Sequence, residues 1–260
     1  MRRTAGGAVV VSIAAVVLAC LTLGVASAER SQRGNLIVSL KGRLAPLKLP
    51  RERPAPVAIH LVGGLQTADG SLLPRVRRIE LGLPGQGVLD TRGLPVCPQR
   101  LLRNTKPPEA LAACRGALVG HGRLRAVVAL PNQEPFMARA EMRAFNGRIG
   151  KSRAVVLHAY LNDPPAVVVL PFRIGPGSGR FGTALVADLG TALGPSVRFA
   201  HFQIELSRRF SRGGQARSYL SATCPVPEGT GGFFSLARVE FTLVDGRRIS
   251  QGIARSCRAR

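Results

Sequence analysis

Apolar and polar residues alternate in one segment after another of this 260-residue chain, and this pattern constrains its fold more than any other feature. In the segment RRIELGL, Ile79, Leu81 and Leu83 alternate with Glu80 and Gly82. Successive side chains of a β-strand point to opposite faces, so a two-residue period is typical of a strand that buries one face. Similar runs recur through most of the sequence, which predicts a protein built almost entirely from strands.

The residues between the alternating runs predict how the strands connect. Asn146-Gly147 and Asp245-Gly246 each lie between two such runs, and these dipeptides favour tight turns that join antiparallel strands. One helix is expected near residues 108–114, where Pro108 suits a first helical turn and Glu109 suits the positive end of the helix dipole. The sequence therefore predicts an all-β, antiparallel, β-sandwich-like fold of about a dozen strands with one short helix.

Two proline-containing breaks, at residues 131–135 and 162–165, interrupt the alternation. Proline cannot donate to a strand ladder, so such breaks are candidate boundaries between units. We predict an N-terminal β half over residues 29–163 and a C-terminal β half over residues 164–260. Together they are long enough for one large β domain or two small ones.

The first 28 residues have the features of a helical secretory signal peptide. A positively charged start is followed by an uncharged apolar run and by small residues before Glu29, so we predict cleavage after Ala28. Two alternatives stay open: lipid attachment at Cys20, because the residues ending there resemble a lipoprotein cleavage box, and retention of the apolar run as a membrane anchor. All three place the remaining chain outside the cytoplasm, as a secreted or envelope-associated protein.

Four cysteines follow this segment, Cys97, Cys114, Cys224 and Cys257. An even number of cysteines in an exported chain predicts disulfides. The pairs Cys97–Cys114 and Cys224–Cys257 are each local in sequence and bracket one structural unit, so we predict these two bonds. The cysteines lack the close spacing of zinc ligands and the four histidines are scattered, so no metal site is predicted.

A glycine-rich segment raises the question of a nucleotide cofactor. Gly177, Gly179 and Gly182 have G-x-G-x-x-G spacing after an apolar run, and Glu205 follows at about the position of a ribose-binding acid. A dinucleotide-binding fold needs alternating strands and helices, whereas this chain shows hairpins, and Gly190 interrupts the helix that would follow. We therefore predict a hairpin loop at these glycines, with no nucleotide site and no cofactor.

Several cysteine-centred segments carry a family resemblance: LDTRGLPVC, ALAACRGALVG, RSYLSATCPVP and the terminal SCRAR. Together they resemble an uncharacterised family of secreted, arginine-rich proteins of high-GC actinobacteria, and the resemblance covers most of the chain after residue 28. The family has no assigned activity, so the resemblance implies export and a cysteine framework at the four positions named above. It implies no catalytic or binding residue.

Motifs for catalysis are missing from the sequence. Ser178 lacks the flanking glycines of a G-x-S-x-G nucleophile elbow, and no H-E-x-x-H segment occurs. We predict no catalytic residue, and the alternative is a secreted hydrolase with an active site that no motif marks. His158 is the first histidine to inspect for such a site. The strand-borne acids to inspect for a facing pair are Glu80, Asp90, Glu141, Asp188 and Glu205.

The strongest functional feature is the positive charge, with 37 Lys and Arg against 14 Asp and Glu. Arg123 with Arg125, and Arg139 with Arg143, have the spacing of side chains on one strand face. Such rows suit anionic envelope polymers or membrane surfaces, although a solvated basic face is the simpler interpretation. No recognition-helix module is present, so sequence-specific nucleic-acid binding is not expected. We predict a binding or structural component of the cell envelope with affinity for anionic surfaces.

Overall fold

A computed structural model describes residues 29–162, 164–190 and 192–260. Thirteen strands form one large sheet, and they are between two and 14 residues long. Their bounds are β1 (Arg30–Arg33), β2 (Leu36–Ala45), β3 (Lys48–Leu49), β5 (Ala58–Thr67), β6 (Val76–Pro84), β8 (Leu118–Val128), β9 (Phe136–Ile149), β10 (Ser152–Asn162), β11 (Pro165–Pro176), β12 (Phe181–Asp188), β13 (Val197–Leu206), β17 (Gly231–Leu243) and β18 (Arg248–Ala259).

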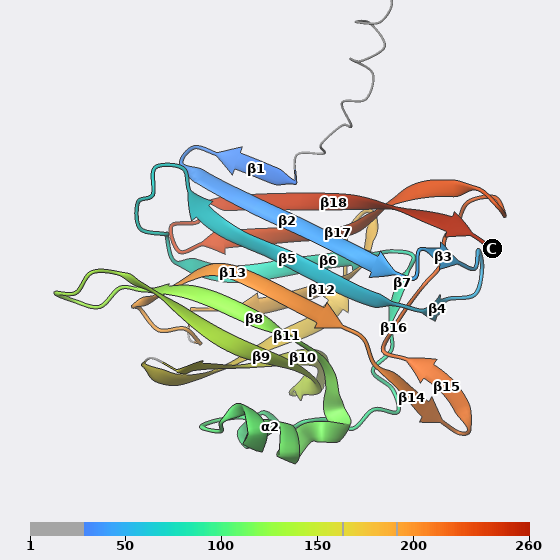
Figure 1. Ribbon diagram of the computed structural model, residues 1–260, viewed down its shortest axis with the longest axis horizontal. Helices are drawn as coiled ribbons and strands as arrows, with labels where there is room; N and C mark the ends of the chain where they lie inside the picture. Colours follow the sequence, from blue (N-terminus) through green and yellow to red (C-terminus); the bar gives the residue numbers. More distant parts are fainter. Residues whose placement is uncertain (1–28, 163, 191) are drawn as a thin grey trace, which may run out of the picture.

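The strand order in this sheet is β1-β2-β5-β13-β8-β9-β10-β11-β12-β6-β17-β18-β3 (Figure 1). All neighbouring pairs of the described strands are antiparallel except β18 and β3, which are parallel. The predicted mainly-β, antiparallel architecture is confirmed.

The remaining elements are short. A three-stranded sheet has the order β4-β16-β7, and a two-stranded sheet pairs β14 with β15. Their bounds are β4 (Ala55–Pro56), β7 (Gly87–Leu89), β14 (Arg209–Arg212), β15 (Gln215–Ser218) and β16 (Leu220–Ala222). Among the described residues there is one α-helix, α2 (Pro107–Cys114), which lies between two 3₁₀ turns, η2 (Gln99–Leu101) and η3 (Arg115–Ala117). Figure 1 shows β4, β7 and β16 gathered at one end of the large sheet, and α2 beside β9 and β10.

The large sheet is curled into a half-barrel, so the predicted sandwich is wrong. Strands from the two ends of the strand order, β2 and β18, approach each other: Arg255 on β18 donates to the carbonyl of Gly42 on β2. A Cβ at Gly42 would lie only 2.8 Å from Cδ1 of Ile253. Register irregularities in β8, β12, β13 and β17 bend the strands and add twist to the sheet. A single sheet therefore covers its own apolar face.

The two predicted halves of the chain contribute alternately to this sheet. β5 precedes the proposed boundary at residues 163/164, and it pairs with β13, which follows that boundary and pairs in turn with β8. On the other side of the sheet, β6 lies between β12 and β17. Strands from residues 29–163 and 164–260 thus share one hydrogen-bonded sheet.

The two predicted hairpin turns have different outcomes. Asp245-Gly246 lies in the turn between β17 and β18, and Gly246 adopts a φ of 88°, so this turn is confirmed. The β9–β10 hairpin also exists, but its turn is at Gly150-Lys151 rather than at Asn146-Gly147. Asn146 is buried within β9, where its amide donates to the carbonyls of Leu94 and Pro95 at 3.4 and 3.0 Å. These long-range hydrogen bonds override the local turn preference.

The predicted helix and both predicted disulfides are present. In α2 the carboxylate of Glu109 accepts from the backbone N–H of Lys106 at 3.0 Å, which caps the first turn. Cys97–Cys114 joins the end of α2 to the segment before it, with Cα atoms 5.5 Å apart. Cys224–Cys257 joins β18 to the segment after β16, with Cα atoms 5.9 Å apart.

Apolar side chains form two cores on opposite faces of the sheet. The main core lies on the concave face and draws side chains from nearly every long strand. The second core lies on the convex face, where the segment containing α2 covers part of β9 and β10. Its buried members are Cys97, Leu102, Ala110, Cys114, Ala117, Phe145, Ala154 and Val156.

The predictions for the N-terminus fall on residues 1–28, outside the described residues. Cleavage after Ala28, lipid attachment at Cys20 and a retained anchor therefore stay predictions. Among the residues from 29 onward that the structure describes, no helix is both long and apolar enough to cross a membrane. The two disulfides are typical of a protein outside the cytoplasm.

Candidate ligand-binding site

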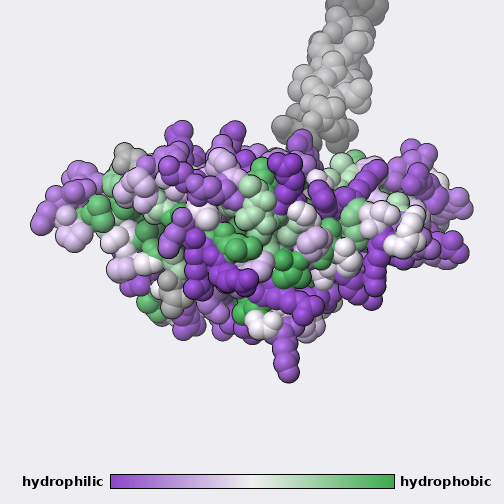
Figure 2. Space-filling view, turned by 90° about the horizontal axis from the view of Figure 1, so that it is seen from below, coloured by the Kyte–Doolittle hydropathy of each residue, from purple (hydrophilic) through white to green (hydrophobic). Residues whose placement is uncertain are grey.

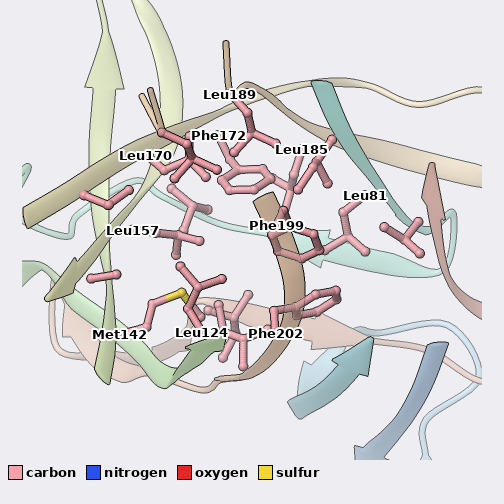
Figure 3. A pocket seen from close by; sticks show the side chains of 18 residues that line it. Leu81, Leu124, Met142, Leu157, Leu170, Phe172, Leu185, Leu189, Phe199 and Phe202 are labelled. Atoms are coloured by element: carbon pink, nitrogen blue, oxygen red, sulfur yellow. The ribbon is translucent and has the colours of Figure 1, made fainter. Parts of the chain in front are cut away.

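A cavity of about 80 Å³ lies in the main core, on the concave side of the curled sheet. Figure 3 shows Leu124, Leu157, Phe172 and Phe199 around a common space, although they come from four different strands. Its 18 lining residues are Ile79, Leu81, Leu124, Met142, Val155, Leu157, Ala159, Val168, Leu170, Phe172, Leu185, Leu189, Leu193, Phe199, Phe202, Ile204, Leu206 and Val239.

The alternation seen in the sequence builds the cavity wall. On β10, Val155, Leu157 and Ala159 line the cavity, whereas Val156 belongs to the second core and His158 points to the same convex face. Because successive strand residues face opposite ways, one strand supplies both structures. Several lining side chains, Leu157 and Phe172 among them, are only half-buried although they face the interior. Part of their surface therefore faces the cavity rather than other protein atoms.

The chemistry of the wall is uniform. All 18 lining side chains are apolar, and the part of the chain that the structure describes contributes no charged or hydrogen-bonding side chain to this wall. One water needs roughly 10–15 Å³ of cavity space, so the cavity has room for several ligand atoms. Without an acid, base or nucleophile in the wall, the interior suits binding by apolar burial and not bond-breaking chemistry.

The four arginines singled out from the sequence lie on the convex face of β8 and β9. Arg125 is directly opposite Arg139, and Arg123 is directly opposite Glu141. Arg123, Arg125 and Arg139 are exposed, and Arg143 is half-buried near α2. The structure thus brings the four onto one face, with Glu141 among them, while their role in binding polymers stays a prediction.

The charges on this face are partly balanced. Arg143 forms an ion pair with Glu141 at 3.3 Å. Among the ion pairs of the described residues, none involves Arg123, Arg125 or Arg139. Burial, and to a smaller extent the charge of Arg125, lower the pKa of the neighbouring His201. This histidine is therefore neutral at pH 7 and leaves the arginines as the main charges.

All four histidines lie on strands of the large sheet, and their side chains are on this convex face. His60 and His121 are the register partners of Glu205 on either side of β13. His158 is fully buried, and its Nε2 donates to the carbonyl of Thr105 at 2.9 Å. Within the described ranges no three His, Cys, Asp or Glu side chains are grouped in a way that could hold a metal ion. The contacts of His158 are those of a structural residue that anchors the segment before α2.

Three of the five acids singled out from the sequence are paired with arginines. Asp90, Asp188 and Glu141 each have an arginine within 4.0 Å. Glu80 is directly opposite Glu240, but Glu240 accepts a hydrogen bond from Arg238 at 2.8 Å. The hollow beside this pair has a volume of about 20 Å³, which is space for roughly one or two waters.

The glycine-rich segment at residues 177–182 is the turn of the β11–β12 hairpin, as predicted. Gly179 adopts a φ of 59°, and the N–H of Phe181 donates to the carbonyl of Ser178 at 3.1 Å. A strand follows this turn, so the N–H groups of a helix terminus, on which a dinucleotide phosphate would rest, do not follow these glycines.

Sequence reasoning did not identify the cavity or two polar residues at the same end of the fold, Tyr219 and Arg208. Tyr219 is fully buried in the main core, and Arg208 is its backbone hydrogen-bond partner. Neither residue lies in an alternating run of any length, so no local pattern marks them. Their importance follows only from the way that the short strands close the end of the curled sheet.

Comparisons with known proteins identify no relative: no protein-family model, no curated protein and no solved structure matches the chain.

Proposed function

We propose that this protein binds an apolar ligand, or the apolar part of a larger one, inside its curled sheet. The observation that carries the proposal is the cavity wall of 18 apolar side chains. Burial of apolar surface contributes roughly 25 cal/mol per Å², and concave apolar pockets are the usual sites of small ligands. The expected export and the two disulfides are consistent with a binding protein that works outside the cytoplasm.

The placement of the ionisable groups favours binding over the alternative of a secreted hydrolase. A hydrolase needs a nucleophile, an acid or a base within reach of its substrate. Here the histidines and the paired acids described above lie on the convex face, across the sheet from the cavity. The hollow beside the facing acids Glu80 and Glu240 has only about 20 Å³.

A cavity-filling substitution tests this proposal. Ala159→Leu adds three carbons at a lining position on β10 and should abolish binding of 1-octanol, a short uncharged probe, as measured by calorimetry. Leu157→Phe provides a second filling variant in case the first one does not fold. Ala254→Leu adds the same side chain at an exposed position of β18 and should bind the probe like the unaltered protein.

The filling variants also have an expected effect on stability. Added carbons that enter the cavity should leave the thermal midpoint unchanged or raise it, because they gain contacts without displacing packed atoms. Equal affinity for 1-octanol in Ala159→Leu, Leu157→Phe and the unaltered protein would show that the probe binds elsewhere, and the proposal would then be withdrawn.

A second candidate function is attachment to anionic envelope polymers or anionic membrane surfaces through the convex face. It is supported by the juxtaposition of Arg125 and Arg139 in neighbouring strands, with Arg123 beside them and no carboxylate partner for these three among the described residues. Figure 2 shows hydrophobic residues in separate patches among hydrophilic ones on one face of the molecule. Such a surface suits charge-driven contact more than a large apolar interface.

Retention on an anionic polymer over a salt series tests the second candidate. Replacing Arg123, Arg125, Arg139 and Arg143 by Gln should lower the salt concentration at which the protein elutes, because fewer counterions are released on binding. The matched control replaces four exposed arginines from separate segments, Arg33, Arg51, Arg115 and Arg217. An equal loss in both variants would show that only net charge matters and would remove the arginine face as a site.

A further inference from the structure

Polar residues lie two positions along the chain from two of the residues that line the cavity, although none of them belongs to its wall. On β10, the exposed Arg153 precedes the lining residue Val155 by two positions. After β13, Arg208 follows the lining residue Leu206 by two positions. On β10, positions two apart point to the same face, so Arg153 lies on the cavity side of that strand. Arg208 lies just beyond the end of β13 at Leu206. A cationic residue is therefore two positions from a lining residue at the end of each of these two apolar rows.

A buried tyrosine lies directly beside Arg208. The pairing of β14 with β15 places Arg209 opposite Ser218, and one step further the N–H of Tyr219 donates to the carbonyl of Arg208 at 2.7 Å. Residues directly opposite in an antiparallel pair carry their side chains on the same face, with Cβ atoms about 4.5–5.5 Å apart. Arg208 and Tyr219 are thus neighbours at this end of the main core.

Both side chains have a donor that is shielded from solvent and unpaired. Tyr219 has 0% exposure, and in the described parts of the chain neither its hydroxyl nor the Nε of Arg208 has a hydrogen-bond partner. Burial raises the pKa of Tyr219, and the charge of Arg153 lowers it to a smaller extent. The phenol therefore remains a proton donor at all ordinary pH values, with Arg153 close enough to act on it. Buried donors without acceptors are rare because they cost stability.

We propose that the ligand is an alkyl carboxylate, with its chain in the apolar cavity and its head group bound by Tyr219 and Arg208. This inference rests on the proposed function and specifies the class of ligand. A carboxylate has two oxygens, one for the phenolic O–H and one for the Arg208 Nε–H, and its charge is balanced by Arg208 and by Arg153 at the rim. A phosphate would leave further oxygens without donors in a shielded place, which is unfavourable.

The size of the cavity limits the chain. A volume of about 80 Å³ corresponds to about five to eight water-sized sites at roughly 10–15 Å³ each. A methylene group is similar in size to a water molecule. Chains of about six to eight carbons therefore fit the cavity as it stands, which makes octanoate the natural probe.

The composition of the chain provides a direct readout of this site. The sequence has no tryptophan and only two tyrosines, Tyr160 and Tyr219. In a Tyr160→Phe background, the tyrosine band of the near-ultraviolet circular dichroism spectrum comes from Tyr219, and the Tyr160→Phe, Tyr219→Phe double variant gives the remaining signal of the phenylalanines and disulfides. Octanoate bound at the proposed place should change this signal with the same dissociation constant that calorimetry gives. A saturable calorimetric signal for octanoate without any change at Tyr219 would contradict the proposed head-group site.

The comparison of octanoate with 1-octanol separates the contribution of the head group to the affinity from that of the alkyl chain. We expect octanoate to bind about tenfold more tightly or better, because hydrogen bonds to charged groups are the strong ones. Arg208→Met should remove this preference and leave the affinity for 1-octanol within about twofold. Tyr219→Phe should lower the affinity for octanoate by about three- to tenfold, without lowering the thermal midpoint of the free protein. Arg209→Met removes the same charge one position away, on exposed β14, and should change neither probe.

The outcomes distinguish this inference from the function on which it rests. If 1-octanol binds in an Ala159-dependent way but octanoate is not preferred, the cavity site stands and the carboxylate assignment fails. Equal effects of Arg208→Met and Arg209→Met would show that the preference for octanoate depends only on net charge. This result would also overturn the carboxylate assignment. Octyl phosphate binding as tightly as octanoate would overturn the choice of a carboxylate. If neither octanoate nor 1-octanol binds, both proposals fail.

Discussion

The two cores on either side of the sheet are built from the same strands but are packed differently. In the second core, Phe145, Ala154 and Val156 are each 0% exposed, and the Cys97–Cys114 bond closes over them. In the main core, the 18 residues around the cavity include half-buried side chains such as Leu157 and Phe172. One core is tightly filled, and the other encloses space.

The difference in packing is consistent with different roles for the two cores. Protein interiors normally pack as densely as organic crystals, so a cavity costs contacts that a filled core would have. The small convex core holds the α2 segment against β9 and β10, a purely structural task. The large concave core can tolerate the cavity because it draws stability from many other buried side chains. The proposed binding function would account for a cavity that costs such contacts.

The largest expected effect contrasts one residue of each core. Phe145→Ala should lower the free energy of unfolding by about 3–5 kcal/mol, because it removes a fully buried ring from a filled core. Leu157→Ala should cost less, about 2 kcal/mol, because this half-buried side chain already faces the cavity. Urea unfolding of the two variants measures the difference. Equal losses would mean that the two cores do not differ in packing.

The next effect concerns the disulfides, one in each core. Replacing both cysteines of Cys224–Cys257 by alanine should cost about 4 kcal/mol, and the same change at Cys97–Cys114 about 3 kcal/mol, because the first bond closes a loop of 33 residues and the second one of 17. Thermal unfolding of the two double variants checks the order. A larger loss at Cys97–Cys114 would show that the smaller core depends on its bond beyond loop closure.

Much of the local structure could be predicted from the sequence because local rules govern it. The alternation around Leu81 and Leu157 identifies the strands and their buried faces, and Asp245-Gly246 marks a true turn. The helix at Pro107–Cys114 begins with the prolines and the capping Glu109 that predicted it. The disulfide pairing followed from sequence distance, since each bond closes within one unit.

The features that the sequence did not predict depend on contacts between distant segments of the chain. An alternating strand shows which face is buried, but not whether a second sheet or the curl of its own sheet covers that face. Asn146 illustrates the same limit: its hydrogen bonds to Leu94 and Pro95 lie about 50 positions away in sequence and keep it within a strand. Likewise, the backbone hydrogen bond between Tyr219 and Arg208 and the effect of the Arg153 charge on the pKa of Tyr219 depend on segments that are far apart in the sequence.

The smallest expected effect is a pH dependence of the second core. Nε2 of His158 donates to Thr105, so its Nδ1 carries a lone pair, and this atom is buried without a partner among the described residues. Burial lowers the pKa of His158 from 6.5; the hydrogen bond to Thr105 raises it, and the charge of Arg143 lowers it further. Below pH 6.5 the unfolded chain therefore binds a proton that the folded protein resists. Stability should be constant above pH 6.5 and fall as the pH drops below it.

Urea unfolding between pH 8 and pH 5 measures this effect, with His158→Asn as the test variant and His121→Asn, at an exposed position, as the control. His158→Asn should flatten the fall in stability, whereas His121→Asn should not change it. Part of the slope should remain in both variants, because the pKa of His201 is lowered as well, mainly by burial. Hydrogen exchange should show that acid first loosens the segment around α2 and leaves the cavity strands protected. An unchanged slope in His158→Asn would show that this buried histidine does not set the acid sensitivity of the second core.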